Sequence, residues 1–67
     1  MISYNRLWDY MKKNRISQYK LTKSGISHSS LTRLKRDQSV SLETIDKLCG
    51  ILDCNIEDIV ECVKERE

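Results

Sequence analysis

The residues between His28 and Arg36 offer the clearest chemistry in this sequence. At about 100° per residue their polar members share one helix face, and this face contains no acidic residue. Leu31 and Leu34 fall on the opposite side. The polar face consists of His28, Ser29, Thr32, Arg33 and Arg36, with Lys35 at its edge. Its hydroxyl, imidazole and guanidinium groups suit the base edges and phosphates of duplex DNA.

A major groove admits one helix, and several side chains on this face have a matching base. The forked guanidinium of Arg33 can bond to guanine O6 and N7, and Thr32 can offer its methyl group to thymine. His28 and Ser29 lie at the helix start, where recognition helices contact DNA. We therefore predict base contacts from His28, Ser29, Thr32 and Arg33. The alternative is an ordinary solvent-exposed helix face, which is also polar and charged.

The basic residues are concentrated in the same half of the chain. The 67 residues have a net charge of +2, from 12 Lys and Arg against 10 Asp and Glu. Residues 1–36 hold nine basic residues and one acid, whereas residues 37–67 hold three basic residues and nine acids. This division of about +8 against −6 predicts one face for a polyanion and another turned away from it.

The three cysteines, Cys49, Cys54 and Cys62, make a poor disulfide framework because their number is odd. Their C-x4-C-x7-C spacing differs from that of zinc sites, and the single histidine, His28, is distant in sequence. We expect thiols that pack as small hydrophobic groups, no metal or other cofactor, and a reducing, cytoplasmic location.

The length predicts one domain over residues 1–67 and leaves little chain to wall a catalytic cleft. No Ser/His/Asp set can be placed, because the histidine lies on the predicted groove face. With only Gly25 and Gly50 available, no glycine-rich phosphate loop exists. We predict a protein that is not an enzyme, spans no membrane and has no small-molecule effector.

Hydrophobic spacing and capping residues predict an all-α fold of five helices. Asn14 is expected to end the first helix in a left-handed conformation. The N-cap candidates are Ser3, Ser17, Ser27, Ser41 and Asn55, the last with Asp58 at the capping-box position. The predicted helices span 4–13, 18–24, 28–36, 42–52 and 56–63.

The second and third predicted helices are separated by a very short connection. Only two or three residues around Gly25 join helix 18–24 to helix 28–36. Two helices joined by a short, glycine-containing turn are the layout of a helix-turn-helix. The last predicted helix would bury a stripe formed by Ile56, Ile59, Val60 and Val63.

The order and spacing of these segments resemble a known family. The first half of the resemblance is carried by Ile16-Ser-Gln-Tyr-Lys-Leu21, Ser24-Gly-Ile-Ser27 and Leu31-Thr-Arg-Leu34. The second half is carried by Ser41-Leu-Glu-Thr-Ile45, Leu48-Cys49, Ile51-Leu-Asp-Cys54 and Asp58-Ile-Val-Glu61. From about Tyr4 to Glu61 the chain resembles the Cro/C1-type (Xre-like) helix-turn-helix domain. It is also similar to the small stand-alone regulators of vancomycin-resistance gene clusters.

The resemblance implies a compact, lambda-repressor-like five-helix domain that binds operator DNA as a symmetric dimer. It places phosphate contacts at the start of helix 18–24 and around the end of helix 28–36. The expected backbone-contacting residues are Ser17, Gln18, Lys35, Arg36 and Ser39. Gly25 matches the turn glycine, where a positive φ is commonly needed.

Two positions depart from the family pattern. Thr22 stands where the family often has alanine, and the distance to Gly25 makes helix 18–24 one residue short. Family members often carry Asn-Gly after the recognition helix, whereas this chain has Arg36-Asp37. We therefore expect the loop after helix 28–36 to approach the phosphates in its own way.

The sequence favours a transcriptional regulator that reads duplex DNA with helix 28–36, as a homodimer on a palindromic operator. The expected dimer surface is the last helix and its approach, including Val60 and Val63. The alternative is a protein-interaction module of the same fold, such as an antitoxin-like or adaptor domain that binds through its acidic half. A regulator that senses metal through the three cysteines is a third possibility.

Overall fold

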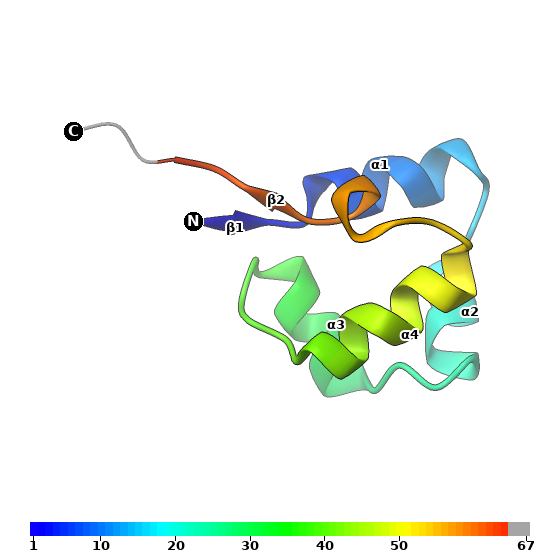
Figure 1. Ribbon diagram of the computed structural model, residues 1–67. Coiled ribbons are helices and arrows are strands. Elements are labelled where there is room, and N and C mark those ends of the chain that lie inside the picture. The colour runs from blue at the N-terminus through cyan, green and yellow to red at the C-terminus, as the bar shows by residue number, and fades with distance from the viewer. Residues whose placement is uncertain (65–67) are drawn as a thin grey trace.

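The computed structural model describes residues 1–64, in which four α-helices surround a common core and two short strands pair at one end (Figure 1). The helices are α1 (Asn5–Lys13), α2 (Gln18–Lys23), α3 (His28–Lys35) and α4 (Leu42–Leu52). A single 3-10 turn, η1 (Ile56–Asp58), follows, and strands β1 (Ile2–Ser3) and β2 (Glu61–Cys62) complete the fold. The first four predicted helices are therefore confirmed, with ends shifted by at most one residue.

Serine side chains begin three of the helices, as predicted. Ser17, Ser27 and Ser41 accept hydrogen bonds from the third residue beyond them, at 3.3, 3.1 and 3.1 Å. Each bond satisfies a backbone N–H group that lacks a partner inside the helix. The predicted Ser3 cap is wrong, because Tyr4 is the N-cap of α1 and has no side-chain cap bond. The Ser3 hydroxyl instead accepts a bond from the Asn5 N–H at 3.3 Å.

All four helices are followed by a residue in the left-handed conformation. Their φ angles are +57° at Arg15, +111° at Gly25, +54° at Asp37 and +53° at Asp53. After each of the four helices the next N–H group bonds back across the final turn, at 2.8, 3.0, 2.8 and 3.1 Å for α1 to α4. This pattern is the Schellman motif, which uses carbonyl groups that the helix leaves free. Asn14 ends α1 as predicted, because it is the C-cap, but the left-handed conformation falls on the next residue, Arg15.

The turn between α2 and α3 depends on Gly25 for its backbone conformation. Its φ of +111° is strained for residues with a Cβ atom, although a Cβ built there meets no atom within 4 Å. The restriction therefore comes from the torsion and not from crowding. Ile26 follows immediately and is buried, so the turn is fixed to the core before Ser27 begins α3.

The predicted fifth helix over 56–63 is wrong. The Asn55 N–H bonds to the Asp58 carboxylate at 3.0 Å, as the capping box predicted, but the helical turn ends at Asp58. Ile2 then pairs with Cys62, and Ser3 with Glu61, in an antiparallel ribbon. The β-branched residues near Val60 favour this extended pairing, which adds a β element to the predicted all-α fold.

The core joins every helix to the C-terminal segment. Leu7, Leu21, Leu34, Leu48 and Ile59 are the largest side chains that lose essentially all contact with solvent. They come from α1, α2, α3, α4 and the residue that follows η1, respectively. The orientation of α3 is therefore fixed by contacts with the rest of the fold.

Candidate nucleic-acid interface

The exposed face of α3 is the one that the sequence predicted. Leu31 and Leu34 point into the core, with 7% and 0% of their surface exposed. The four residues predicted to touch bases, His28, Ser29, Thr32 and Arg33, are all exposed. The helix His28–Lys35 contains no acidic residue, so this face presents donors and positive charge.

Hydrogen bonds within α3 fix the orientation of some of these side chains. The Thr32 hydroxyl donates to the His28 carbonyl at 2.9 Å, which uses its proton within the helix. Its methyl group and oxygen lone pairs remain available to a ligand. The Ser27 hydroxyl donates to the Ser30 hydroxyl at 3.0 Å and accepts from the Ser30 N–H. Ser27 therefore holds the helix start, and Ser29 remains free to face outward.

The start of α2 carries Ser17 and Gln18, which the family resemblance assigned to phosphates. Both are exposed, and the Ser17 hydroxyl oxygen accepts the Lys20 N–H at 3.3 Å. The O–H of Ser17 can still donate a second bond outward. Tyr19 is 71% exposed, and the Lys23 ammonium lies 6.0 Å from the centre of its ring. Lys23, the last residue of α2, therefore places its positive charge near Tyr19, which directly follows the candidate phosphate contact Gln18.

The end of α3 and the loop that follows carry Lys35, Arg36 and Ser39, all of them exposed. This loop is fastened to the first turn of α1. The Tyr4 N–H donates to Asp37 Oδ1 at 3.0 Å, and the Tyr4 hydroxyl donates to the Gln38 carbonyl at 2.8 Å. Burial raises the pKa of the Tyr4 hydroxyl and outweighs a backbone hydrogen bond that lowers it, while the Asp37 charge adds a smaller increase, so the hydroxyl stays protonated.

Comparison with known proteins identifies the family to which this chain belongs. A family model described as a Cro/C1-type HTH DNA-binding domain matches residues 6–65. The chain belongs to this family. Among solved structures it is similar to the transcriptional regulator VanUg in crystal form II, with a TM-score of 0.88 and 31% identity. The likeness covers 96% of this chain and 87% of that one. No curated protein matches the chain.

These findings confirm the resemblance drawn from the sequence. The Cro/C1-type domain has the helix-turn-helix over α2 and α3, and the name of the solved neighbour agrees with the closer resemblance to small regulators. The residue-level contacts with bases and phosphates remain predictions. One feature of this Cro/C1-type domain was missed, because Asp37 bonds to a residue 33 positions away in sequence. The only sign of this bond in the sequence is that Asp37 stands where family members often have glycine.

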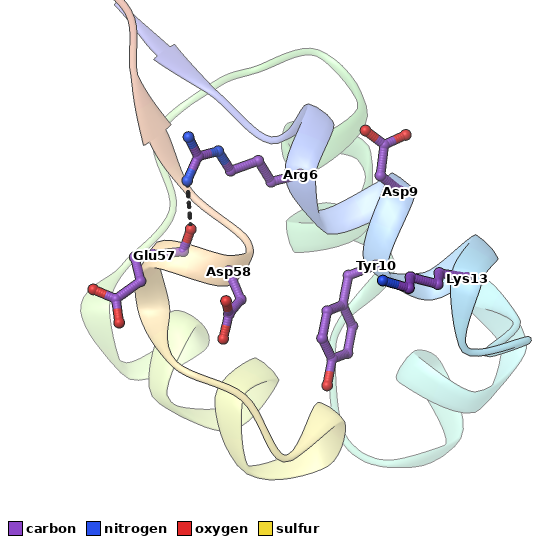
Figure 2. Close-up of a pocket in the computed structure, with 6 residues that line it drawn as sticks. All are labelled: Arg6, Asp9, Tyr10, Lys13, Glu57 and Asp58. Carbon is purple, nitrogen blue, oxygen red and sulfur yellow. Dashed lines mark hydrogen bonds between the residues drawn. The ribbon is translucent and has the colours of Figure 1, made fainter.

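A cavity of about 250 Å³ opens between α1 and η1, and no residue of α3 lines it (Figure 2). The Arg6 guanidinium reaches across it to the Glu57 carbonyl at 3.0 Å and to Glu61 Oε1 at 3.3 Å. Asp58 accepts the Asn55 N–H, and the Tyr10 hydroxyl donates to the Leu52 carbonyl at 3.1 Å. These polar groups hold the C-terminal segment to the Cro/C1-type domain, so we assign the cavity a structural role.

The three thiols are free and differ in their surroundings. Cys49 and Cys54 are half-buried against the core, in partial agreement with the packing role predicted for them, whereas Cys62 is exposed on β2. Burial raises the pKa of the Cys54 thiol to about 11, with further contributions from Cys49 and Asp58. Within residues 1–64 no three His, Cys, Asp or Glu side chains are grouped to hold a metal ion.

The helices of this Cro/C1-type domain have between 6 and 11 residues. In the part of the chain that the structure describes, none is long and apolar enough to cross a bilayer.

Proposed function

We propose that this Cro/C1-type domain is a sequence-specific transcriptional regulator that reads the major groove with α3. The observation that carries the proposal is the exposed, acid-free face of a helix held rigidly by Leu31 and Leu34. Arg33 would bond to guanine, and Thr32 would present its methyl group to thymine. The likeness to a protein named as a transcriptional regulator supports the same role.

In this proposal the contacts with the DNA backbone come from both ends of the helix-turn-helix. Ser17 and Gln18 would hold phosphates at the start of α2, and Lys35, Arg36 and Ser39 would hold them after α3. Such contacts release counterions, so affinity should fall steeply with salt. The three free thiols fit a cytoplasmic location, where such a regulator would meet its operator.

Binding-site selection with random duplex DNA tests this function, and Arg33→Ala tests the assignment of α3. Loss of a bidentate guanine contact should weaken binding to the selected site by about 1–3 kcal/mol and relax one base position. Lys47→Ala is the control, because it removes an equal charge from α4, which has no proposed base contact. Equal affinity and base preference in the Arg33→Ala variant would show that α3 does not read the groove.

We also propose that two copies bind one palindromic operator. The predicted dimer helix is absent, but an apolar groove of about 300 Å³ lies where α4 begins, between β1 and η1. Val60 lines this groove, as do Ile2 and Leu42. The side chains of Leu42 and Ile56 are 79% and 48% exposed, so apolar surface beside the groove is left in contact with water. A second copy related by a two-fold axis could insert its own Leu42 here, which makes the contact self-complementary.

Sedimentation with and without the selected DNA tests the dimer. Wild type should form complexes of two chains per duplex, on half-sites about 34–36 Å apart. Leu42→Ser should shift these complexes toward one chain per duplex. Tyr19→Ser is the control, because it removes another large exposed side chain that lies outside the groove, and it should not change the oligomeric state. If only one chain ever bound each duplex, the dimer would be excluded. If no DNA were selected and a different protein bound at this groove, the interaction-module function would be favoured instead.

A further inference from the structure

Asp37 has a different position from the other acids of the chain, because it lies within the predicted DNA-contacting surface. It follows Arg36 directly and precedes Ser39 by two residues, and both are proposed phosphate contacts. A negative charge there repels phosphates, so its presence needs a compensating role. Its carboxylate is not free in the structure, because Oδ1 accepts the Tyr4 N–H at 3.0 Å.

The partner of Asp37 is the N-terminus of α1, where the Ser3 hydroxyl accepts the Asn5 N–H and Asp37 accepts the Tyr4 N–H. No acidic residue lies in the first turn of α1, and its N-cap residue, Tyr4, makes no side-chain cap bond. A carboxylate at a helix N-terminus is stabilised by the helix dipole and by the free N–H groups there. Asp37 therefore accepts, from a distant part of the chain, the N-cap N–H group that a Glu or Gln at the third helical position accepts in a capping box.

The same residue also ends α3. Asp37 has φ = +54°, its N–H bonds to the Leu34 carbonyl at 3.3 Å, and the next N–H bonds to the Arg33 carbonyl at 2.8 Å. One residue thus closes the last turn of α3 and binds the first turn of α1. The hydroxyl of Tyr4, which is 3% exposed, fastens the loop a second time through the Gln38 carbonyl.

We propose that Asp37 is a positioning residue for DNA recognition, whose carboxylate anchors the end of α3 to α1 and so fixes the angle at which α3 meets the groove. This inference rests on the proposed DNA-reading role of α3. The anchor itself is independent of DNA, so the two can be tested apart. The carboxylate makes opposing contributions: its hydrogen bond orders the reading helix, and its charge weakens attraction to phosphate.

A pair of substitutions separates the two contributions. Asp37→Asn removes the charge and keeps an oxygen that can accept the Tyr4 N–H, and asparagine tolerates positive φ. Asp37→Gly also removes the charge and relieves the backbone, but it has no acceptor. The two variants therefore differ chiefly in the anchor. Asp37→Ala is avoided, because its Cβ at this φ would add strain to the loss of the bond.

We expect Asp37→Asn to bind its operator about two- to threefold more tightly than wild type at low salt, with unchanged base preference. Asp37→Gly should bind the operator about five- to tenfold more weakly than Asp37→Asn. Random-sequence DNA, which needs no fixed helix angle, should be bound equally by the two variants. Equal operator affinity and equal base preference in the two variants would overturn the positioning role.

The matched control is Asp53, the same residue type in the same left-handed conformation, at the end of α4. Asp53→Asn and Asp53→Gly should have equal operator-to-random affinity ratios. Hydrogen exchange of the Tyr4 amide gives a readout without DNA, and it should be several-fold faster in Asp37→Gly than in Asp37→Asn. Equal exchange rates would overturn the anchor. Faster exchange together with no DNA binding by wild type would retain the anchor and overturn the proposed function instead.

Discussion

The helix-turn-helix, residues 17–36, and the C-terminal segment, residues 55–63, begin with similar capping signals and reach different structures. α3 continues for two turns after its Ser27 cap, because both Leu31 and Leu34 find the core. The C-terminal segment makes one 3-10 turn, after which Ile59 is buried but Val63 stays 43% exposed. A cap determines where a helix can begin, whereas a continuing buried face determines how far it extends.

The largest expected effect tests whether the two regions share one core. Leu34→Ala in α3 and Ile59→Ala in the C-terminal segment each remove a side chain that is at most 1% exposed. Each should lower the free energy of unfolding by about 2–5 kcal/mol, which approaches the whole stability expected for so small a domain. Urea unfolding followed by circular dichroism measures both, with Val63→Ala as the exposed control.

A small effect of Ile59→Ala, close to that of the control, would mean that the C-terminal segment is only appended to the helix-turn-helix. Similar losses in both variants would show that the segment completes the core on which α3 rests.

The second prediction concerns Cys54, which directly precedes the C-terminal segment. Burial raises its thiol pKa from 9.0 to about 11, so the fold favours the protonated form. Its stabilising contribution is therefore complete below about pH 9 and is lost as the pH rises toward 11. At pH 8 the folded protein should be alkylated at Cys54 about tenfold more slowly than the urea-unfolded chain, because the lower thiolate population outweighs the greater nucleophilicity of a thiolate with a higher pKa.

Mass spectrometry after iodoacetamide treatment measures this ratio. The exposed Cys62 gives an internal control, since its accessibility changes less on unfolding. Equal protection of the two thiols would contradict the burial of Cys54.

A third comparison sets the two capping devices against each other. Ser27→Ala removes the bond to the Ser30 N–H and should destabilise the protein by about 1 kcal/mol. Asp58→Ala removes the bond to the Asn55 N–H in a segment with only one turn to support, so about 0.5 kcal/mol is expected. Thermal unfolding measures both, and a larger loss from Asp58→Ala would reverse the proposed ranking of the two regions.

The smallest effect is expected at the ion pair between α1 and the C-terminal segment. Arg6 and Glu61 are 3.3 Å apart, but their side chains are 52% and 39% exposed. Water and salt screen such a pair, so Glu61→Gln should change stability by no more than about 0.5 kcal/mol. A larger, salt-dependent loss in unfolding experiments would show that this ion pair contributes substantially to holding the C-terminal segment on α1.

Local chemistry was sufficient to predict most of the helical body. Ser17, Ser27 and Ser41 act within three residues of themselves, and the leucines of α3 and α4 repeat at helical spacing. These signals predicted α4 with its observed limits, Leu42–Leu52. They also predicted that residues 28, 29, 32 and 33 of α3 would be exposed together.

The features that sequence reasoning missed depend on distant partners. Nothing near Val60 shows that Met1–Ser3 will pair with residues 61–63, so an amphipathic stripe was interpreted as a helix. Asp37 likewise gives no local sign that its carboxylate will cap α1. Asn14 ends α1 as its residue type predicts, but the left-handed residue is Arg15, after which the hydrophobic Ile16 packs against the core.

The β1–β2 ribbon has a consequence for the order of folding. The Met1 amine donates to the Val63 carbonyl at 3.0 Å, across 62 positions of the chain. Closing so long a loop loses more chain entropy than forming any of the helices, each of which needs only near neighbours. We therefore expect the helices to assemble first and the ribbon to close last. Substitutions in the ribbon should then act mainly by speeding unfolding, while the folding rate stays close to that of the wild type.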